Sequence, residues 1–187
     1  MYQLAYIDHP LLHFLSIRAY AAAMPSLSLP SFLLNDEHGT PTPLFRGRHT
    51  LLAFVGGEAP ATSATLRLLT AAAATFGESM DIVVVQEGGG PGAVGERPGP
   101  HVTLLHDPTG AAADAFALGE LPAVFLAGPA RERLDAWTGF SRKAWQALFA
   151  RLITTTLQPA PMVEWLSFPP SAPASARAAR TATGGTR

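Results

Sequence analysis

The sequence predicts an α/β fold in which a mixed β-sheet carries helices on both faces. Three observations predict it. Short, continuous apolar runs are typical of strands buried on both faces. Segments with apolar residues at helical spacing alternate with these runs, and turns rich in Gly and Pro separate the elements. The resulting order of strand, helix, strand, strand, helix, hairpin and helix favours both parallel and antiparallel pairing.

Four apolar runs are the predicted central strands. Residues 51–55, 82–85 and 102–105 are rich in leucine and β-branched side chains, and residues 123–127 form the fourth run. Residues 133–137 follow the fourth run across a Gly-Pro turn, so we expect them to form its hairpin partner.

Three segments have the pattern of helices. In residues 62–76 the apolar side chains recur every three or four positions, and Gly77 provides a stop. Residues 111–118 form a shorter candidate after an Asp-Pro-Thr-Gly turn. Residues 141–152 form the last one, with Ser141 as the expected N-cap.

The chain is expected to divide into a domain at residues 26–158 and two arms. Residues 1–25 contain a short apolar helix, and residues 159–187 have the Pro, Ala, Ser and Thr content of an unfolded extension. Removing residues 159–187 should therefore leave the melting temperature of the isolated domain nearly unchanged while weakening assembly of the complex. Bulky apolar side chains in both arms need a cover, which predicts contacts with a protein partner through Phe14, Leu15, Trp165, Leu166 and Phe168.

Composition excludes several classes of function. The 13 basic residues balance 14 acidic ones, and this lack of a positive surplus argues against nucleic acid as a partner. The sequence has no cysteine, which excludes disulfides, thiolate metal sites and thiol catalysis. The apolar run at residues 11–17 is far shorter than the roughly 20 residues of a membrane-spanning helix.

Four segments, in order, resemble the thioredoxin-like superfamily, in the branch of peroxiredoxin-like and membrane-associated thiol-disulfide proteins. Residues 30–39 look like its opening hairpin, and residues 51–62 look like the strand that leads into its active-site helix. Residues 120–126 are similar to the segment with its cis-proline, and a Gly-Phe pair before the last helix matches its ending. The resemblance covers residues 29–157 and implies a three-layer fold with a redox site at the start of a helix.

The resemblance also locates what is missing. It places Ala59 at the nucleophilic cysteine and Thr62 at the second cysteine, with Pro60 retained between them and Pro122 at the cis-proline. Peroxiredoxins carry their reactive cysteine at the Thr62 position as well. A methyl group cannot ionise, and a threonine without an adjacent base is not a nucleophile near neutral pH. As an N-cap, Thr62 would accept a hydrogen bond from a first-turn amide.

Other candidate sites are weaker. His9 and His13 are four residues apart, but no third ligand is near in the sequence, so neither a metal nor a cofactor is expected. Ser63 follows the expected strand-to-helix turn and could serve a hydrolase with His106 and Asp107, although the glycine pattern of a nucleophile elbow is absent.

We therefore expect a redox-inactive thioredoxin-like protein that acts as a structural or accessory subunit of a larger complex, with a membrane-bound complex as one setting. The alternative is a small-molecule binder, or a non-thiol enzyme, that uses the groove near Gly56, Gly57 and Pro122. The expected location is the cytoplasm or the cytoplasmic face of a membrane complex, with the periplasm left open.

Overall fold

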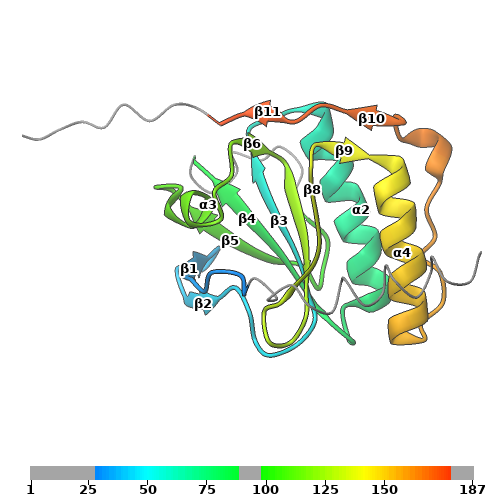
Figure 1. Cartoon of the computed structure of the whole chain (residues 1–187), viewed down its shortest axis with the longest axis horizontal. Coiled ribbons are helices and arrows are strands. Elements are labelled where there is room, and N and C mark those ends of the chain that lie inside the picture. The colour runs from blue at the N-terminus through cyan, green and yellow to red at the C-terminus, as the bar shows by residue number, and fades with distance from the viewer. Residues whose placement is uncertain (1–27, 89–97, 178–187) are drawn as a thin grey trace, which may run out of the picture.

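The computed structural model of the chain describes residues 28–88 and 98–177, which form a three-layer α/β fold (Figure 1). Seven strands form one sheet in the order β2-β1-β5-β4-β3-β7-β8. Their bounds are β1 Leu33–Asp36, β2 Pro41–Pro43, β3 Thr50–Gly56, β4 Asp81–Glu87, β5 Thr103–Asp107, β7 Ala123–Ala127 and β8 Arg133–Thr138. The helices are α2 (Pro60–Phe76), α3 (Ala111–Ala115) and α4 (Arg142–Thr156).

The central strands are apolar on both faces because helices or loops cover both faces. In β3, Ala53 and Val55 face a core formed with α2 and α4, whereas Leu52 and Phe54 face a second core with α3. This alternation explains why the strand reads as a continuous apolar run instead of an alternating one. In Figure 1, α2 and α4 lie together on one side of the sheet and α3 lies on the other.

Strand register brings three distant segments to one edge of the sheet. β3 and β4 are parallel, joined through α2, and Gly56 pairs with Glu87 at their carboxyl ends. β7 runs antiparallel to β3, so its first residue, Ala123, pairs with Phe54 near the same edge. The start of α2, the end of β4 and the turn before β7 therefore meet there.

The expected hairpin and helices are present, with two corrections. β1 and β2 pair antiparallel, with β1 inside the residues 30–39 predicted as a hairpin and β2 just after them. Ser141 caps α4 by accepting a hydrogen bond from the Ala144 amide at 3.2 Å. However, Ala59 is the N-cap of α2, so Thr62 lies inside the first turn and the N-cap prediction for it is wrong. α3 is also shorter than predicted, because Phe116 leaves the helix and packs into the second core.

The C-terminal segment corrects the expectation of an unfolded extension for residues 159–177. It contains a short 3-10 helix, η1 (Trp165–Ser167), and two strands, β10 (Ser171–Ala172) and β11 (Ser175–Ala176). β10 pairs with β9 (Phe140–Ser141), and β11 pairs with β6 (Glu120–Leu121). The segment crosses the end of the molecule above the sheet in Figure 1. Its Pro and Ala content does not prevent packing, because a few large side chains and backbone pairing hold it.

Phe168 is the main apolar anchor of this segment. It is 7% exposed, and its ring stacks on Phe140 with centroids 6.0 Å apart. The Arg67 guanidinium carbon lies 4.5 Å from the centre of the Phe168 ring, which adds a cation-π contact. Phe168 therefore belongs to the core of this chain, and the expectation that its cover is a partner is wrong.

No helix among the described residues has the length and apolar character needed to cross a membrane. The expected N-terminal apolar helix, with Phe14 and Leu15, lies outside the described residues, as do His9 and His13.

Candidate functional site

The start of α2 keeps the backbone of a helix-entrance site without reactive side chains. Ala59 is the N-cap with an extended backbone, Pro60 occupies the first helical position, and the Ser63 amide donates to the Ala59 carbonyl at 3.0 Å. Thr62 is 2% exposed, and its hydroxyl donates to the Gly56 carbonyl at 3.3 Å. The hydroxyl thus stabilises the turn between β3 and α2.

The segment before β7 approaches this helix entrance closely. The Leu121–Pro122 peptide bond is cis, as the resemblance predicted, and both residues are buried. A Cβ at Gly56 would lie only 2.9 Å from Cδ1 of Leu121. Gly56 therefore provides the space into which the Leu121 side chain packs, and this contact joins the end of β3 to the proline turn.

A cavity of about 380 Å³ opens at this edge of the sheet. On one side it is lined by the turn after β3, including Gly57 and Ala59, and on another by Glu87 and Gly88. Leu121, not Pro122, is the lining residue from the proline turn, and β11 with Arg177 forms a further wall. The cavity lies where the sequence predicted a groove, near Gly56, Gly57 and Pro122, and its C-terminal wall was not predicted.

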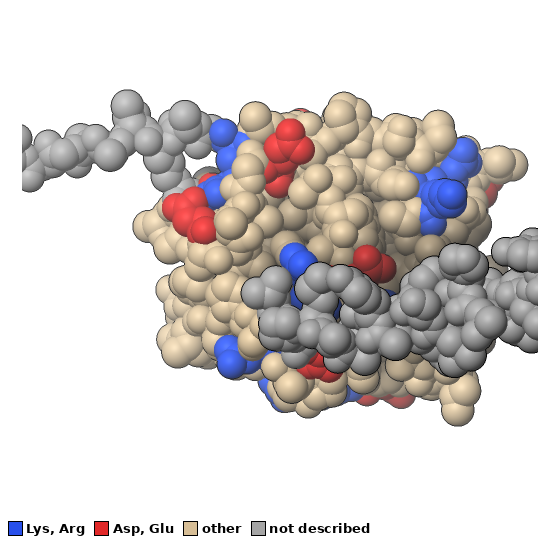
Figure 2. Space-filling view, in the orientation of Figure 1, with Lys and Arg blue, Asp and Glu red and all other residues tan. Residues whose placement is uncertain are grey.

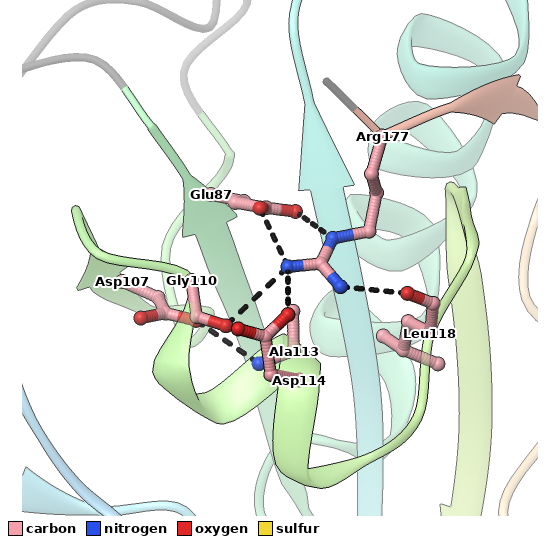
Figure 3. A network of polar contacts seen from close by, with 7 residues as sticks. All are labelled: Glu87, Asp107, Gly110, Ala113, Asp114, Leu118 and Arg177. Atoms are coloured by element: carbon pink, nitrogen blue, oxygen red, sulfur yellow. Dashed lines mark hydrogen bonds and ion pairs between the residues drawn. The ribbon is translucent and has the colours of Figure 1, made fainter. Parts of the chain in front are cut away.

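The Arg177 side chain makes five polar contacts beside this cavity (Figure 3). Its Nε and one terminal nitrogen bind the two carboxylate oxygens of Glu87 at 2.6 and 2.8 Å. The same terminal nitrogen lies 2.7 Å from the Asp114 carboxylate. The remaining contacts are to the backbone carbonyls of Leu118, at 2.6 Å, and Gly110, at 3.3 Å.

The Arg177 network is nearly withdrawn from solvent at its centre. The side chains of Arg177 and Glu87 are each 11% exposed, whereas Asp114 is 62% exposed. The hydrogen bonds that Arg177 donates to Glu87, and then the one to Asp114, hold the pKa of Arg177 above its ordinary value against the opposing effect of burial. Sequence reasoning missed this arginine because its partners lie 59 to 90 positions away along the chain.

The chemistry available at the helix entrance does not include thiol-disulfide exchange. The chain has no cysteine, so no side chain of its own can supply the thiolate that the positive end of a helix would stabilise. The hydrolase alternative gains no support either. Ser63 is exposed on α2, and none of the hydrogen bonds among the described residues links it to His106 or Asp107.

The apolar residues of the C-terminal segment that were predicted to bind a partner differ in burial. Trp165 is half-buried against Phe149, with ring centroids 5.7 Å apart, and also contacts Phe168. Leu166, by contrast, is 91% exposed, and Met162 in the same segment is fully exposed. Of the residues predicted in this arm, Leu166 alone presents its side chain to solvent as expected of a contact residue.

This arrangement defines the thioredoxin-like fold: a central mixed sheet, α2 and α4 on one face, a helix-entrance site after β3 and a cis-proline opposite it. The helix entrance of this fold holds Ala59 and Thr62, and the chain has no cysteine. No protein-family model matches the sequence, and no curated protein matches it.

Solved structures of thiol-disulfide proteins have the same fold. A Chlorobium tepidum protein assigned as a thiol:disulfide interchange protein DsbE aligns with a TM-score of 0.61 and 19% identity, over 68% of this chain and 94% of that one. The exposed lipoprotein thioredoxin Etrx1 of Streptococcus pneumoniae gives 0.54 and 17%, over 65% and 98%. A secreted Mycobacterium tuberculosis disulfide oxidoreductase gives 0.51 and 18%, over 66% and 95%.

Proposed function

We propose that this chain is a redox-inactive thioredoxin-like protein that serves as an accessory, protein-binding subunit of a larger assembly. The observation that carries the proposal is the pairing of a preserved helix entrance at Ala59 and Thr62 with exposed apolar side chains elsewhere. Met162 and Leu166 expose 100% and 91% of their surface on the segment between α4 and β10. Large apolar side chains in water favour contact with another protein.

Much of the surface in view suits such contacts, and Arg67 and Arg142 bind the segment that carries Met162 and Leu166. The face shown in Figure 2 consists mostly of uncharged residues, with acidic and basic side chains in small scattered groups. Interfaces are depleted in charge at their centres, so a surface with this composition has little desolvation cost to overcome. The proposed partners are proteins, with peripheral contact to a membrane complex as one setting, and nucleic acid is not among them.

The first test concerns redox chemistry. We expect the purified chain to neither reduce nor oxidise a protein disulfide substrate above the uncatalysed rate, measured by insulin turbidity and by dithiol oxidation. Activity in a cysteine-free chain would overturn the redox-inactive part of the proposal.

The second test concerns the partner. The tagged chain is co-purified from its native source as wild type, as M162D/L166D, and as L33D, a control in which another exposed apolar residue changes. We expect a stoichiometric protein partner with wild type and L33D that is lost with M162D/L166D. A monomer without a partner, or a partner retained by M162D/L166D, would contradict the proposal.

The same preparations address location. The proposal places the chain in the cytoplasm or at the cytoplasmic face of a membrane complex, whereas two of the similar structures are described as a secreted protein and an exposed lipoprotein. Fractionation of source cells with immunodetection of the chain separates the two compartments.

A second candidate function is small-molecule binding in the cavity of about 380 Å³ beside Gly57 and Ala59. This volume lies within the range of about 300–1,000 Å³ typical of ligand pockets. A thermal-shift screen of small metabolites would support this function if a hit lost its effect in A59F, which narrows the cavity, and kept it in S63F on the exposed face of α2.

A further inference from the structure

We propose that the pocket formed by Glu87, Asp114 and the carbonyls of Leu118 and Gly110 is a receptor for an arginine in an extended peptide, and that Arg177 occupies it in competition with a partner's segment. This receptor deepens the proposed function and rests on it, because it names the chemistry of the bound partner. The inference starts from the contacts that Arg177 makes.

The receptor is matched to a guanidinium group. Glu87 binds Arg177 in a two-pronged geometry at 2.6 and 2.8 Å. Asp114 and the Gly110 carbonyl contact the terminal nitrogen that also binds Glu87, and the Leu118 carbonyl accepts from the other terminal nitrogen. A planar guanidinium has five N–H donors in a fixed fork, and the acceptors of this receptor surround several of them. A lysine ammonium has no such fork, so the receptor should discriminate between the two cations.

The peptide backbone is held independently of its sequence. Ser175 and Ala176 of β11 pair antiparallel with Leu121 and Glu120 of β6, and the Arg177 amide donates to the Gly119 carbonyl at 3.0 Å. Strand pairing of this kind uses main-chain groups, which any extended segment can offer. Specificity must therefore come from the arginine and from the side chains beside it.

The chain's own segment fills this site incompletely. Ser175 and Ala176 line the cavity of about 380 Å³, and both residues are exposed. A larger apolar side chain at one of these two positions would enter the cavity, whose other lining residues include Ala59 and Leu121. A partner's segment with such a side chain would bury apolar surface that the chain's own segment does not, and would thus gain affinity.

Covalent linkage keeps the receptor closed in the absence of such a partner. A tethered segment acts at an effective concentration in the millimolar range for short linkers. A free segment of equal intrinsic affinity cannot compete at micromolar concentration, whereas one that fills the cavity, or one supplied within an assembly, can. β10 and Phe168 keep the rest of the C-terminal segment in place when β11 is displaced.

The test uses the full chain and a labelled peptide with the sequence of residues 169–177, Pro-Pro-Ser-Ala-Pro-Ala-Ser-Ala-Arg. Binding is measured by fluorescence polarisation to wild type, R177A and R177A/E87Q, each checked for folding by circular dichroism. We expect R177A to bind at least about tenfold more tightly than wild type, because the competing tethered arginine is gone. R177A/E87Q should lose this binding, and peptides ending in Lys or Ala should bind R177A weakly.

Leucine in place of the serine or the alanine before the arginine tests the cavity. Adjacent residues of a strand face opposite sides, so we expect one of these two peptides to gain at least about tenfold in affinity. Equal binding of the Arg and Ala peptides, equal binding to wild type and R177A, or no gain from either leucine would overturn the receptor.

If R177A does not fold, a disulfide that fixes β11 to β6 provides a second test of the receptor. Glu120 and Ala176 are opposite each other in the antiparallel pair, both are exposed, and the chain has no other cysteine to interfere with E120C/A176C. Oxidation should prevent binding of the leucine peptides, and reduction should restore it. Equal binding to the oxidised and reduced forms would refute the proposal. A native partner that stays bound to the oxidised form would refute the receptor alone, whereas peptide binding without any native partner would refute the accessory function alone.

Discussion

The start of α2 and the C-terminal segment border the same cavity, but opposite kinds of contact build them. At the start of α2, the Thr62 hydroxyl reaches Gly56, six positions back, and the first helical hydrogen bond joins Ser63 to Ala59. In the C-terminal segment, Arg177 reaches Glu87 across 90 positions. The comparison shows that one site can combine contacts between residues close in the sequence with contacts between residues far apart. Only the first kind can be predicted from a short stretch of sequence.

Composition predicts order poorly in a segment that is held by contacts with residues far away in the sequence. The C-terminal segment has the Pro and Ala content of an unfolded chain, yet Phe168 and Arg177 attach it at two points. One buried aromatic ring and one nearly buried ion pair attach the segment, and a composition averaged over the whole segment does not reveal either of them.

The largest expected effect comes from removing residues 159–187. The sequence alone predicted an unchanged melting temperature, and the structure reverses that expectation, because the deletion uncovers Phe140 and removes Phe168 and the Arg177 network. We expect a loss of at least about 3–5 kcal/mol, which lowers the melting temperature by roughly 10 °C or more. Circular dichroism melting measures it, and an unchanged melting temperature would restore the view of this segment as an independent arm.

Phe168→Ala isolates the apolar anchor of the C-terminal segment. Loss of the buried ring should lower the free energy of unfolding by about 3 kcal/mol or somewhat more. Leu166→Ala is the matched control, because that side chain is 91% exposed, and its effect should stay within about 0.5 kcal/mol. Urea titration measures both variants. Equal effects would mean that Phe168 does not carry the attachment.

A59C/T62C tests whether the start of α2 keeps the geometry of a redox site. The two positions are three residues apart at the start of α2, so we expect their Cα atoms to fall within the span of about 4.4–6.8 Å that a disulfide accepts. The closed bond should stabilise the oxidised form by about 2 kcal/mol over the reduced form of the same variant.

The pKa of the new thiol at position 59 should fall below the free value of about 8.5, since the helix amides favour the thiolate. Mass loss of two hydrogens reports the bond, and the pH dependence of alkylation reports the pKa. No closure together with an unshifted pKa would refute the placement of Ala59 and Thr62.

Thr62→Val and Thr65→Val form a pair that separates a bonded hydroxyl from an unbonded one. Thr62 Oγ1 bonds the Gly56 carbonyl, whereas buried Thr65 Oγ1 has no hydrogen-bond partner among the described residues. We expect Thr62→Val to cost about 1 kcal/mol and Thr65→Val to be neutral or stabilising. Chemical denaturation measures the difference, and the reverse order would show that the turn after β3 does not depend on Thr62.

The smallest effect is expected at Asp36, in the turn between β1 and β2. Its carboxylate accepts hydrogen bonds from the Thr40 and His38 amides, each at 2.8 Å, and the Thr40 bond is the main cause of its lowered pKa. A lowered folded-state pKa stabilises the fold above the ordinary pKa of about 3.8, and this contribution is lost as the pH falls through the folded value.

Asp36→Asn should therefore lower the melting temperature slightly at neutral pH, less than Thr62→Val does. The gap between wild type and Asp36→Asn should close below about pH 4, where the carboxyl becomes protonated. Melting curves across this pH range measure it. A gap that widens in acid would contradict the sign of the shift.

Much of the fold and half of the candidate site could be predicted from the sequence. The buried runs at β3, β4 and β7, the Ser141 cap and the cis bond before Pro122 were predicted, and the structure confirms them. The N-cap of α2 was misplaced by three residues, at Thr62 instead of Ala59, because Pro60 favours the first helical position and leaves Thr62 inside the first turn. The predicted contacts of Phe14 and Leu15 with a partner stay predictions.

The sequence by itself determined the chemistry of this protein: with no cysteine, the position at the helix entrance holds a methyl group and a buried hydroxyl, and no fold can change which atoms are present. Its strands and helices followed from local periodicity, since that pattern is written in neighbouring residues. The tertiary structure alone decided that Phe168 is core, that β11 pairs with β6, and that Arg177 meets Glu87. These contacts join residues that are far apart in the chain. They form only when the rest of the fold brings those residues together, so no local sequence pattern predicts them.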